Sequence, residues 1–404
     1  MIHNVDILHL SKKPHFMTGS FNRFIYEQIR QLNEFRQVMI SYWDKENIIP
    51  DENDIKDAFI TVNKKGLNLF QKLYLMLPKR YQTFGFNGIS GSDKLVYLWQ
   101  TAKLLPRLNP KIIIFYEQYK MGKELRKVIN WPCRFVLAQR RFSHFLEKRE
   151  FKKNCSLGAY DIIWTQAHAA YRFDKARADR YEPLVKVIPN AVDVYKFRPA
   201  SFEEKRILRG KWNLPEKQFV VLLLSRQVPK KGTHLLLHSW PKIISENSNA
   251  YLWILGGGDD SEYRRYLEKM IHSLGLSENV RIQGAVDQNE IHTCYQASDL
   301  YVFPTLHPEG MANTLLEAAA SGLPCIAADH EGAMEHYSKD EVIFVSDPNV
   351  EDVFIEPVLK LIRNDALRES LKHAARSKVE QNYSQEIIFD HLKRFYRRQL
   401  SMLG

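Results

Sequence analysis

The chain has 404 residues, of which 45% are hydrophobic and 26% charged. This balance is typical of a globular protein and excludes a disordered chain, and the length favours two domains over a single hydrophobic core. The net charge of +11 suits an anionic partner, which would be nucleic acid, an anionic membrane surface or a phosphorylated substrate.

Short apolar runs alternate with amphipathic stretches along most of the chain. The predicted strands are residues 5–8, 38–41, 111–116, 134–138, 160–165 and 185–188 in the first half, and 219–224, 251–255, 280–283, 300–303, 324–328 and 342–345 in the second. The predicted helices include residues 21–33, 233–244, 263–273, 314–321, 365–381 and 385–400. Because strand–helix alternation builds parallel sheets covered on both faces, the sequence predicts an α/β protein with two doubly wound, Rossmann-like domains.

Two prolines bracket a polar turn at residues 189–199, and we place the domain boundary there. The expected parts are an N-terminal domain over residues 1–192, a C-terminal domain over residues 193–380 and a terminal helix over residues 381–404 that could pack back on the N-terminal domain. Ligands of doubly wound sheets bind outside the carboxyl ends of the strands, so two facing domains predict a cleft between them.

The sequence also bears on where the protein works. Its first residues lack the apolar core and cleavage site of a signal peptide, and no apolar run is long enough to span a bilayer, so we expect a cytoplasmic protein. Residues 64–81 interleave apolar residues with lysine and arginine. A helix of that composition could bind anionic lipid at the inner face of the plasma membrane, or pack on its own domain with its lysines in solvent.

The four cysteines show neither CxxC nor Cys/His ligand spacing. They are Cys133, Cys155, Cys294 and Cys325. We therefore expect buried free thiols rather than disulfides or a zinc site.

A basic turn follows the predicted strand at residues 219–224. Arg226 and Lys231 come after the strand and just before a helix. Two cations near a helix N-terminus form a receptacle for a diphosphate, since arginine can grip phosphate oxygens bidentately and lysine acts as a compact charge. By itself the pair could equally be a solvated basic turn.

An acidic cluster occupies residues 303–332, with Glu309 and Glu317 on either side of a predicted helix start. Gly310 lets the backbone turn closely around a ligand, and the free N–H groups of the helix start can bind phosphate. Glu317 can accept hydrogen bonds from vicinal hydroxyls such as those of ribose. The neighbouring glycine, asparagine and small residues favour a binding site over solvent-exposed acids.

Together these clusters resemble the signature of the retaining glycosyltransferases of family 4, which have the GT-B fold. Residues 225–232, SRQVPKKG, resemble the family's Arg-x4-Lys-Gly element, and Glu309 and Glu317 resemble its Glu-x7-Glu element. Further matching elements are the interdomain turn at residues 188–197, the glycine-rich turn at 254–260 and the run at 283–305. The resemblance covers the second domain well and the first only loosely.

The resemblance implies a nucleotide-sugar donor site on the second domain. Arg226 and Lys231 would neutralise the diphosphate leaving group, Glu309 would hold the donor sugar, and Glu317 the ribose. The remaining donor-binding residues would be Gly310, Met311 and Ala312 at the sugar, Asn313, Thr314 and Leu315 at the phosphates, Gly256 and Gly258 along the nucleotide, Gly284 at the base, and Gly19 of the first domain near the phosphates.

Fixed cations aimed at a leaving diphosphate would lower the barrier to glycosyl transfer. The sequence contains no Asp-x-Asp of the kind that holds a divalent metal in many other glycosyltransferases. The resemblance therefore implies that no metal or other cofactor is required. It also implies that the acceptor hydroxyl attacks the face that the diphosphate leaves, so that the anomeric configuration is retained.

The first domain would bind the acceptor, a saccharide or a lipid-linked saccharide. Residues 14–32 resemble the family's opening glycine-rich loop and helix, with Ser20 in place of a common second glycine. Where many relatives carry a histidine after a strand, this chain has Gln139. His144 and His168 are candidate substitutes, each of which could also be an ordinary surface or packed histidine.

Three functions compete on the sequence alone. The first is a hexosyltransferase that takes a UDP- or GDP-sugar and acts in polysaccharide or glycolipid assembly. The second is a nucleotide-sugar epimerase on the same fold, which would consume donor without an acceptor. The third is a non-enzymatic binder of nucleic acid, but the sequence shows no basic recognition helix, zinc spacing or aromatic RNA-binding motif, so no nucleic-acid partner is expected.

Overall fold

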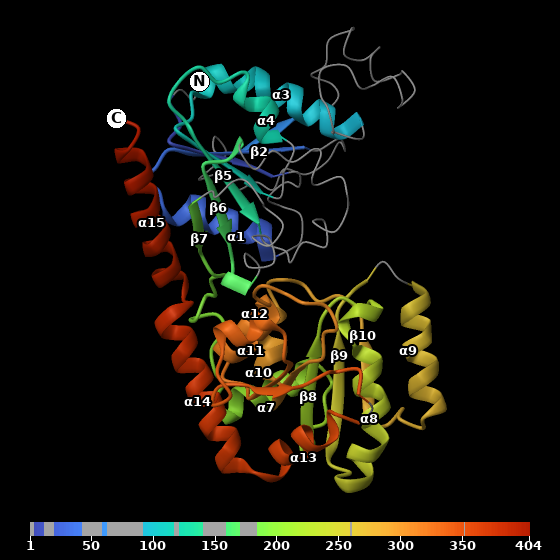
Figure 1. The fold of residues 1–404 in the computed structure, drawn as a ribbon. Helices are drawn as coiled ribbons and strands as arrows, with labels where there is room; N and C mark the ends of the chain where they lie inside the picture. The colour runs from blue at the N-terminus through green and yellow to red at the C-terminus, as the bar shows by residue number, and fades with distance from the viewer. Residues whose placement is uncertain are drawn as a thin grey trace. The chain divides into compact units, whose positions relative to one another are not determined.

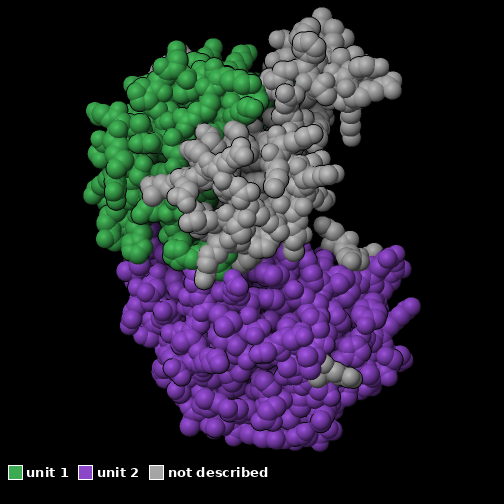
Figure 2. All heavy atoms as spheres, in the orientation of Figure 1, with its two compact units in different colours: residues 1–188, 389–404 green, residues 189–388 purple. Residues whose placement is uncertain are grey.

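The computed structural model describes residues 4–11, 20–42, 59–62, 92–116, 121–139, 159–169, 184–258, 261–350 and 352–404. The chain divides into two units, Met1–Ile188 with Phe389–Gly404, and Pro189–Ile388 (Figures 1 and 2). This division falls close to the boundary that the sequence predicted after residue 192. The predictions for Gly19, residues 64–81, His144 and Cys155 lie outside the described residues.

The first unit contains a parallel sheet with the strand order β3-β2-β1-β4-β5-β6-β7. Its strands are β1 (Ile7–Leu10), β2 (Gln37–Tyr42), β3 (Phe59–Val62), β4 (Ile112–Tyr116), β5 (Arg134–Gln139), β6 (Ile162–Thr165) and β7 (Leu184–Val187). Within the described residues before the linker, its helices are α1 (Ser20–Gln31), α3 (Ser92–Leu108) and α4 (Met121–Arg126). The sequence had predicted all of these strands except β3, which has four residues and lies at the edge of the sheet.

The second unit contains a parallel sheet with the strand order β10-β9-β8-β11-β12-β13. Its strands are β8 (Phe219–Leu224), β9 (Ala250–Leu255), β10 (Val280–Gln283), β11 (Leu300–Phe303), β12 (Cys325–Ala328) and β13 (Ile343–Val345). Its helices include α7 (Phe202–Lys211), α8 (Thr233–Glu246), α9 (Ser261–Ser273), α10 (Ile291–Gln296), α11 (Asn313–Ala320), α12 (Glu331–His336), α13 (Ile355–Arg363) and α14 (Asp365–Asn382). The strand positions agree with the sequence prediction to within one residue at each end.

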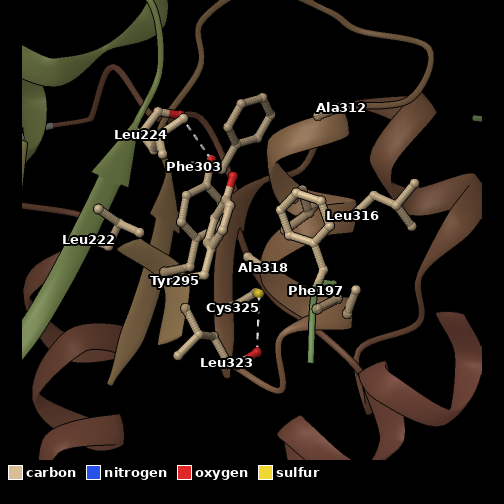
Figure 3. Close-up of a cluster of buried hydrophobic side chains, with 14 of the residues drawn as sticks. Phe197, Leu222, Leu224, Tyr295, Phe303, Ala312, Leu316, Ala318, Leu323 and Cys325 are labelled. Atoms are coloured by element: carbon tan, nitrogen blue, oxygen red, sulfur yellow. Dashed lines mark hydrogen bonds between the residues drawn. The ribbon is translucent and has the colours of Figure 1, made fainter. Parts of the chain in front are cut away.

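Both faces of the second sheet are covered by apolar side chains. Along β8, Val220, Leu222 and Leu224 belong to one buried cluster, whereas Val221 and Leu223 belong to another. Successive residues of a strand point to opposite faces, so a strand buried on both faces reads as a continuous apolar run. Figure 3 shows part of the first cluster. This cluster lies under the loops described in the next subsection.

The described cysteines are buried and free, as predicted. They are Cys133, Cys294 and Cys325. Burial raises the pKa of the Cys133 and Cys294 thiols to about 12. These thiols are therefore neutral packing groups rather than nucleophiles or metal ligands.

The last helix, α15 (Gln385–Ser401), begins in the second unit and belongs to the first unit from Phe389 onward. Tyr396 accepts a 2.5 Å hydrogen bond from Gln28 Nε2 of α1. Glu34, which follows α1, pairs with Lys393 at 3.0 Å and Arg397 at 2.7 Å. The end of the chain is thus built into the first unit by aromatic, polar and charged contacts.

Candidate active site

The site lies where the second sheet reverses its strand order. The chain enters at β8, adds β9 and β10 on one side, and then returns to place β11 on the other side of β8. Ligands of doubly wound sheets bind at this switch point, outside the carboxyl ends of the strands. The loops after β8 and β11 meet here, because Leu306 N donates to Lys230 O at 2.9 Å.

Lys231 and Glu309 form an ion pair across these two loops. Lys231 ends the short 3₁₀ turn Pro229–Lys231 and is 9% exposed. Its Nζ pairs with Glu309 Oε1 and lies 5.4 Å from the centre of the Phe303 ring. A buried ammonium requires such a partner, since an unpaired charge in an apolar setting is strongly unfavourable. The structure therefore brings together two of the three predicted catalytic residues.

Arg226, the third predicted catalytic residue, follows β8 on the same loop as Lys231. Its side chain is exposed and makes no hydrogen bond or ion pair with the described part of the chain. The loop itself is fixed by Gln227, which is 1% exposed. Gln227 Nε2 donates to Ser225 O at 3.0 Å and to Leu255 O at 3.1 Å, and its Oε1 accepts from Thr233. Arg226 is thus an available cation on an anchored backbone.

The predicted glycines stand at the ends of β9 and β10. Gly256 has a φ of +130°, and a Cβ there would lie 1.8 Å from Ser225 O. A Cβ on Gly258 would lie 2.6 Å from Gln227 O. Gly256 N donates to Gly284 O at 3.1 Å, which joins the third predicted glycine to the other two. Glycine is required where these loops approach the Arg226 loop so closely.

The start of α11 offers backbone donors next to this loop. Ala312 is the N-cap residue, and within the described residues its side chain makes no capping hydrogen bond. The first N–H groups of a helix have no partner within it, so the helix start at Asn313, Thr314 and Leu315 suits an anion. Met311 and Ala312 are buried at 5% and 7% exposure. Asn190 Nδ2 donates to Met311 O at 3.1 Å and fixes this segment.

Glu317 lies one turn further along α11 and is partly buried. Its Oε2 accepts a 2.9 Å hydrogen bond from the Tyr295 hydroxyl. A side chain of α10 therefore holds the Glu317 carboxylate in place.

Two residues after β12 support the Glu309 loop. A Cβ on Gly332 would lie 1.9 Å from Glu309 O and 2.6 Å from Gly310 O. His330 Nε2 lies 2.7 Å from Thr305 O. Sequence reasoning missed these two residues together with Gln227, Asn190 and Tyr295. The signal it had for them was that all five lie within the segments that resemble the family, where it gave them no role of their own.

The remaining predictions concern the first unit, a metal and the membrane. His168 lies just after β6 with its side chain exposed, and Gln139 ends β5. Within the described residues no group of three or more histidines, cysteines or acids could hold a metal ion. In the same part of the chain no helix has the length and apolar character needed to cross a membrane.

Two doubly wound sheets, with a site at the switch point of the second, are the features of a GT-B fold. The structure of the Anabaena protein HepE, solved with UDP and glucose, matches 98% of this chain and 100% of its own with a TM-score of 0.77 and 16% sequence identity. Residues 204–378 match the model of the family Glycosyl transferases group 1. The predicted GT-B fold and the resemblance to family 4 are thereby confirmed.

Two curated relatives are similar over part of their length. A GDP-mannose-dependent monoacylated alpha-(1-6)-phosphatidylinositol monomannoside mannosyltransferase of Corynebacterium glutamicum is 30% identical over 52% of this chain and 55% of its own. A capsular polysaccharide biosynthesis glycosyltransferase, CapM of Staphylococcus aureus, is 27% identical over 60% of this chain and 62% of its own. The chain thus spans between half and two thirds of these relatives.

Proposed function

We propose that the protein is a retaining glycosyltransferase of the hexosyltransferase type, which moves a sugar from a nucleotide-sugar donor to an acceptor hydroxyl. The observation that supports this most is the group of charges at the switch point of the second sheet. Arg226, which is exposed and has no side-chain partner among the described residues, and the ion pair of buried Lys231 with partly buried Glu309 lie on loops that are hydrogen-bonded to each other. This combination suits a ligand that carries both a diphosphate and a hydroxylated sugar.

The proposed chemistry needs no protein nucleophile. The bond from the anomeric carbon to the diphosphate oxygen breaks, and a bond from the acceptor oxygen to the same carbon forms on the same face. The acceptor proton passes to the departing diphosphate. Arg226 and Lys231 stabilise the negative charge that develops there, and such preorganised charge is the usual main source of catalysis in transfer reactions. On this proposal no divalent metal is required.

The donor is proposed to be a UDP- or GDP-sugar, and the acceptor a saccharide or lipid-linked saccharide. The names of the relatives support this, since one uses GDP-mannose on a phosphatidylinositol mannoside and another acts in capsular polysaccharide biosynthesis. We accordingly propose a role in polysaccharide or glycolipid assembly, in the cytoplasm or peripherally on an anionic membrane surface. Nucleic acid is not a proposed partner.

A thermal-shift panel with UDP, GDP, ADP and CMP, each with magnesium and with a chelator, tests this proposal. A nucleotide at a hundredfold excess over its Kd stabilises the folded protein by about 2.7 kcal/mol, which raises Tm by several degrees. We expect UDP or GDP to stand out equally with and without magnesium. No shift with any nucleotide would contradict the proposed donor site. In a separate activity assay, consumption of the nucleotide sugar without any acceptor would instead indicate an epimerase.

A further inference from the structure

Tyr295 is a buried aromatic residue whose hydroxyl reaches a proposed donor-binding residue. Its side chain is 0% exposed, and its hydroxyl donates to Glu317 Oε2 at 2.9 Å. The ring packs edge-on against Tyr301 at 5.8 Å and Phe197 at 6.0 Å between centroids. Figure 3 shows Tyr295 within the core cluster, together with Phe197 and Leu316 of the surrounding elements. The hydroxyl therefore has a fixed position set by the core.

The bond from Tyr295 orients a charged group. A glutamate on a helix surface has several rotatable bonds, and holding it in one conformation carries an entropic penalty. A hydrogen bond to a carboxylate is stronger than one between neutral groups. Burial, together with the neighbouring Glu317 charge, raises the pKa of Tyr295 well above its ordinary value. The hydroxyl thus remains a donor at any pH at which the enzyme would work.

We propose that Tyr295 is a positioning residue that holds the Glu317 carboxylate ready to accept hydrogen bonds from the ribose hydroxyls of the nucleotide. Because one carboxylate oxygen is engaged by Tyr295, the orientation of the other is set before the ligand arrives. Such preorganisation favours a ligand that supplies ribose hydroxyls over one that lacks them. This inference rests on the proposed function, since it assigns a partner to the carboxylate within the proposed donor site.

The test compares Tyr295→Phe with wild type in calorimetric titrations of UDP and GDP and of their 2′,3′-dideoxy analogues. The substitution removes one oxygen and keeps the ring that fills the core. For the nucleotide that binds wild type, we expect Tyr295→Phe to raise the Kd roughly tenfold, a change of about 1.4 kcal/mol. The Kd of the dideoxy analogue should change by less than about twofold, so the variant loses most of its preference for the ribonucleotide.

The control is Tyr337→Phe. Tyr337 belongs to the same core cluster, and its buried hydroxyl has no hydrogen-bond partner among the described residues. Its removal should leave both affinities unchanged. Combining Tyr295→Phe with Glu317→Gln should cause little further loss beyond Glu317→Gln alone, because the two side chains act through one bond.

Two kinds of result overturn the inference. If wild type binds a nucleotide and Tyr295→Phe keeps the same ratio of ribonucleotide to dideoxynucleotide affinity, Tyr295 has only a packing role. The same conclusion follows if the variant loses affinity for the ribonucleotide and the dideoxynucleotide by the same factor. If wild type binds neither UDP nor GDP, the proposed function is wrong, and the inference about Tyr295 is then wrong as well. The wild-type titration separates these two cases.

Discussion

The cations at the switch point differ in how much the fold depends on them. Lys231 is buried and paired with Glu309, so removing either partner leaves an uncompensated charge and destabilises the loop. Arg226 is exposed and unpaired within the described residues, so its removal should leave the fold intact. A substitution at Arg226 is therefore expected to change turnover without changing the stability of the fold.

We predict that Arg226→Ala lowers turnover by roughly two to three orders of magnitude, the scale of removing one preorganised charge donor from a transition state. Steady-state kinetics with the natural donor would measure this, and the Tm should stay within about 2 °C of wild type. Lys230→Ala is the matched control, because Lys230 is an exposed lysine on the same loop. Near-normal turnover in Arg226→Ala would show that Arg226 does not stabilise the leaving group.

His9 is a buried histidine whose protonation state follows from its hydrogen bonds. It is fully buried in β1, with Nε2 3.0 Å from Gln37 Oε1 and Nδ1 3.0 Å from the Tyr116 hydroxyl. Gln37 Nε2 donates to Leu32 O, which leaves Gln37 Oε1 as the acceptor. The His9 proton must then be on Nε2, and Nδ1 accepts from Tyr116. Burial lowers the pKa of His9 to about 4.

This low pKa predicts that acid weakens the folded state through His9. The unfolded chain takes up the proton near pH 6.5 and the folded chain only near pH 4. Stability is therefore complete above pH 6.5 and falls toward pH 4, by about 3 kcal/mol in all. Urea unfolding between pH 7 and pH 4.5 should show a shallower pH dependence for His9→Gln than for wild type. His272→Gln, at an exposed position on α9, should keep the wild-type slope; equal slopes for all three proteins would contradict the prediction.

At the scale of elements, the start of α12 is packed against the backbone of the Glu309 loop. Gly332 has no room for a Cβ, since the atoms it would meet are the carbonyl oxygens of Glu309 and Gly310. Backbone atoms cannot turn aside as a flexible side chain can. Any side chain at Gly332 must therefore push the loop away from α12 and displace Glu309.

We predict that Gly332→Ala lowers kcat by roughly tenfold to a hundredfold, because a displacement on the order of 1 Å in a catalytic group costs about that much. The measurement is kcat and KM with the natural donor, together with Tm. Gly210→Ala is the matched control, since Gly210 is exposed on α7 with no atom within 4 Å of an added Cβ. That control should keep full activity and gain up to about 1 kcal/mol from better helix propensity. Full activity in Gly332→Ala would mean that the loop position is not critical.

The sequence predicted the strands of the second unit well because they are buried on both faces and read as apolar runs. It missed β3, a short edge strand. It assigned roles to Lys231 and Glu309 through motif spacing. Gln227 and Asn190 lie in segments that resemble the family, but sequence reasoning assigned them no role. Their roles depend on hydrogen bonds to Leu255 and Met311, which are distant in the chain. Polar residues that fix a loop through backbone carbonyls carry no periodic or compositional signal.

At the scale of the whole molecule, the chain returns to its first unit after completing the second. The segment that returns is Phe389–Gly404. Phe389 packs on Phe24 at 5.8 Å and Tyr396 on Phe35 at 5.6 Å between ring centroids. Leu392 and Tyr396 are both 0% exposed. The first unit therefore lacks part of its core until the last residues of the chain are in place.

We predict that ending the chain after Ile388 unfolds the first unit while the second unit stays folded. Each of the large apolar side chains removed contributes roughly 1.5–3 kcal/mol when buried, and together they approach the total stability of about 5–15 kcal/mol of an ordinary domain. Limited proteolysis with mass spectrometry should then show rapid cleavage within residues 1–188 and protection of residues 189–388. Ending the chain after Ser401 is the control, because it removes only Met402 and Gly404, which are exposed, and Leu403, which is partly buried, and it should change neither pattern. Two results for the chain that ends at Ile388 would contradict the prediction. Cleavage of both units at equal rates would show that the second unit also depends on residues 389–404. Protection of both units would show that the first unit does not need these residues.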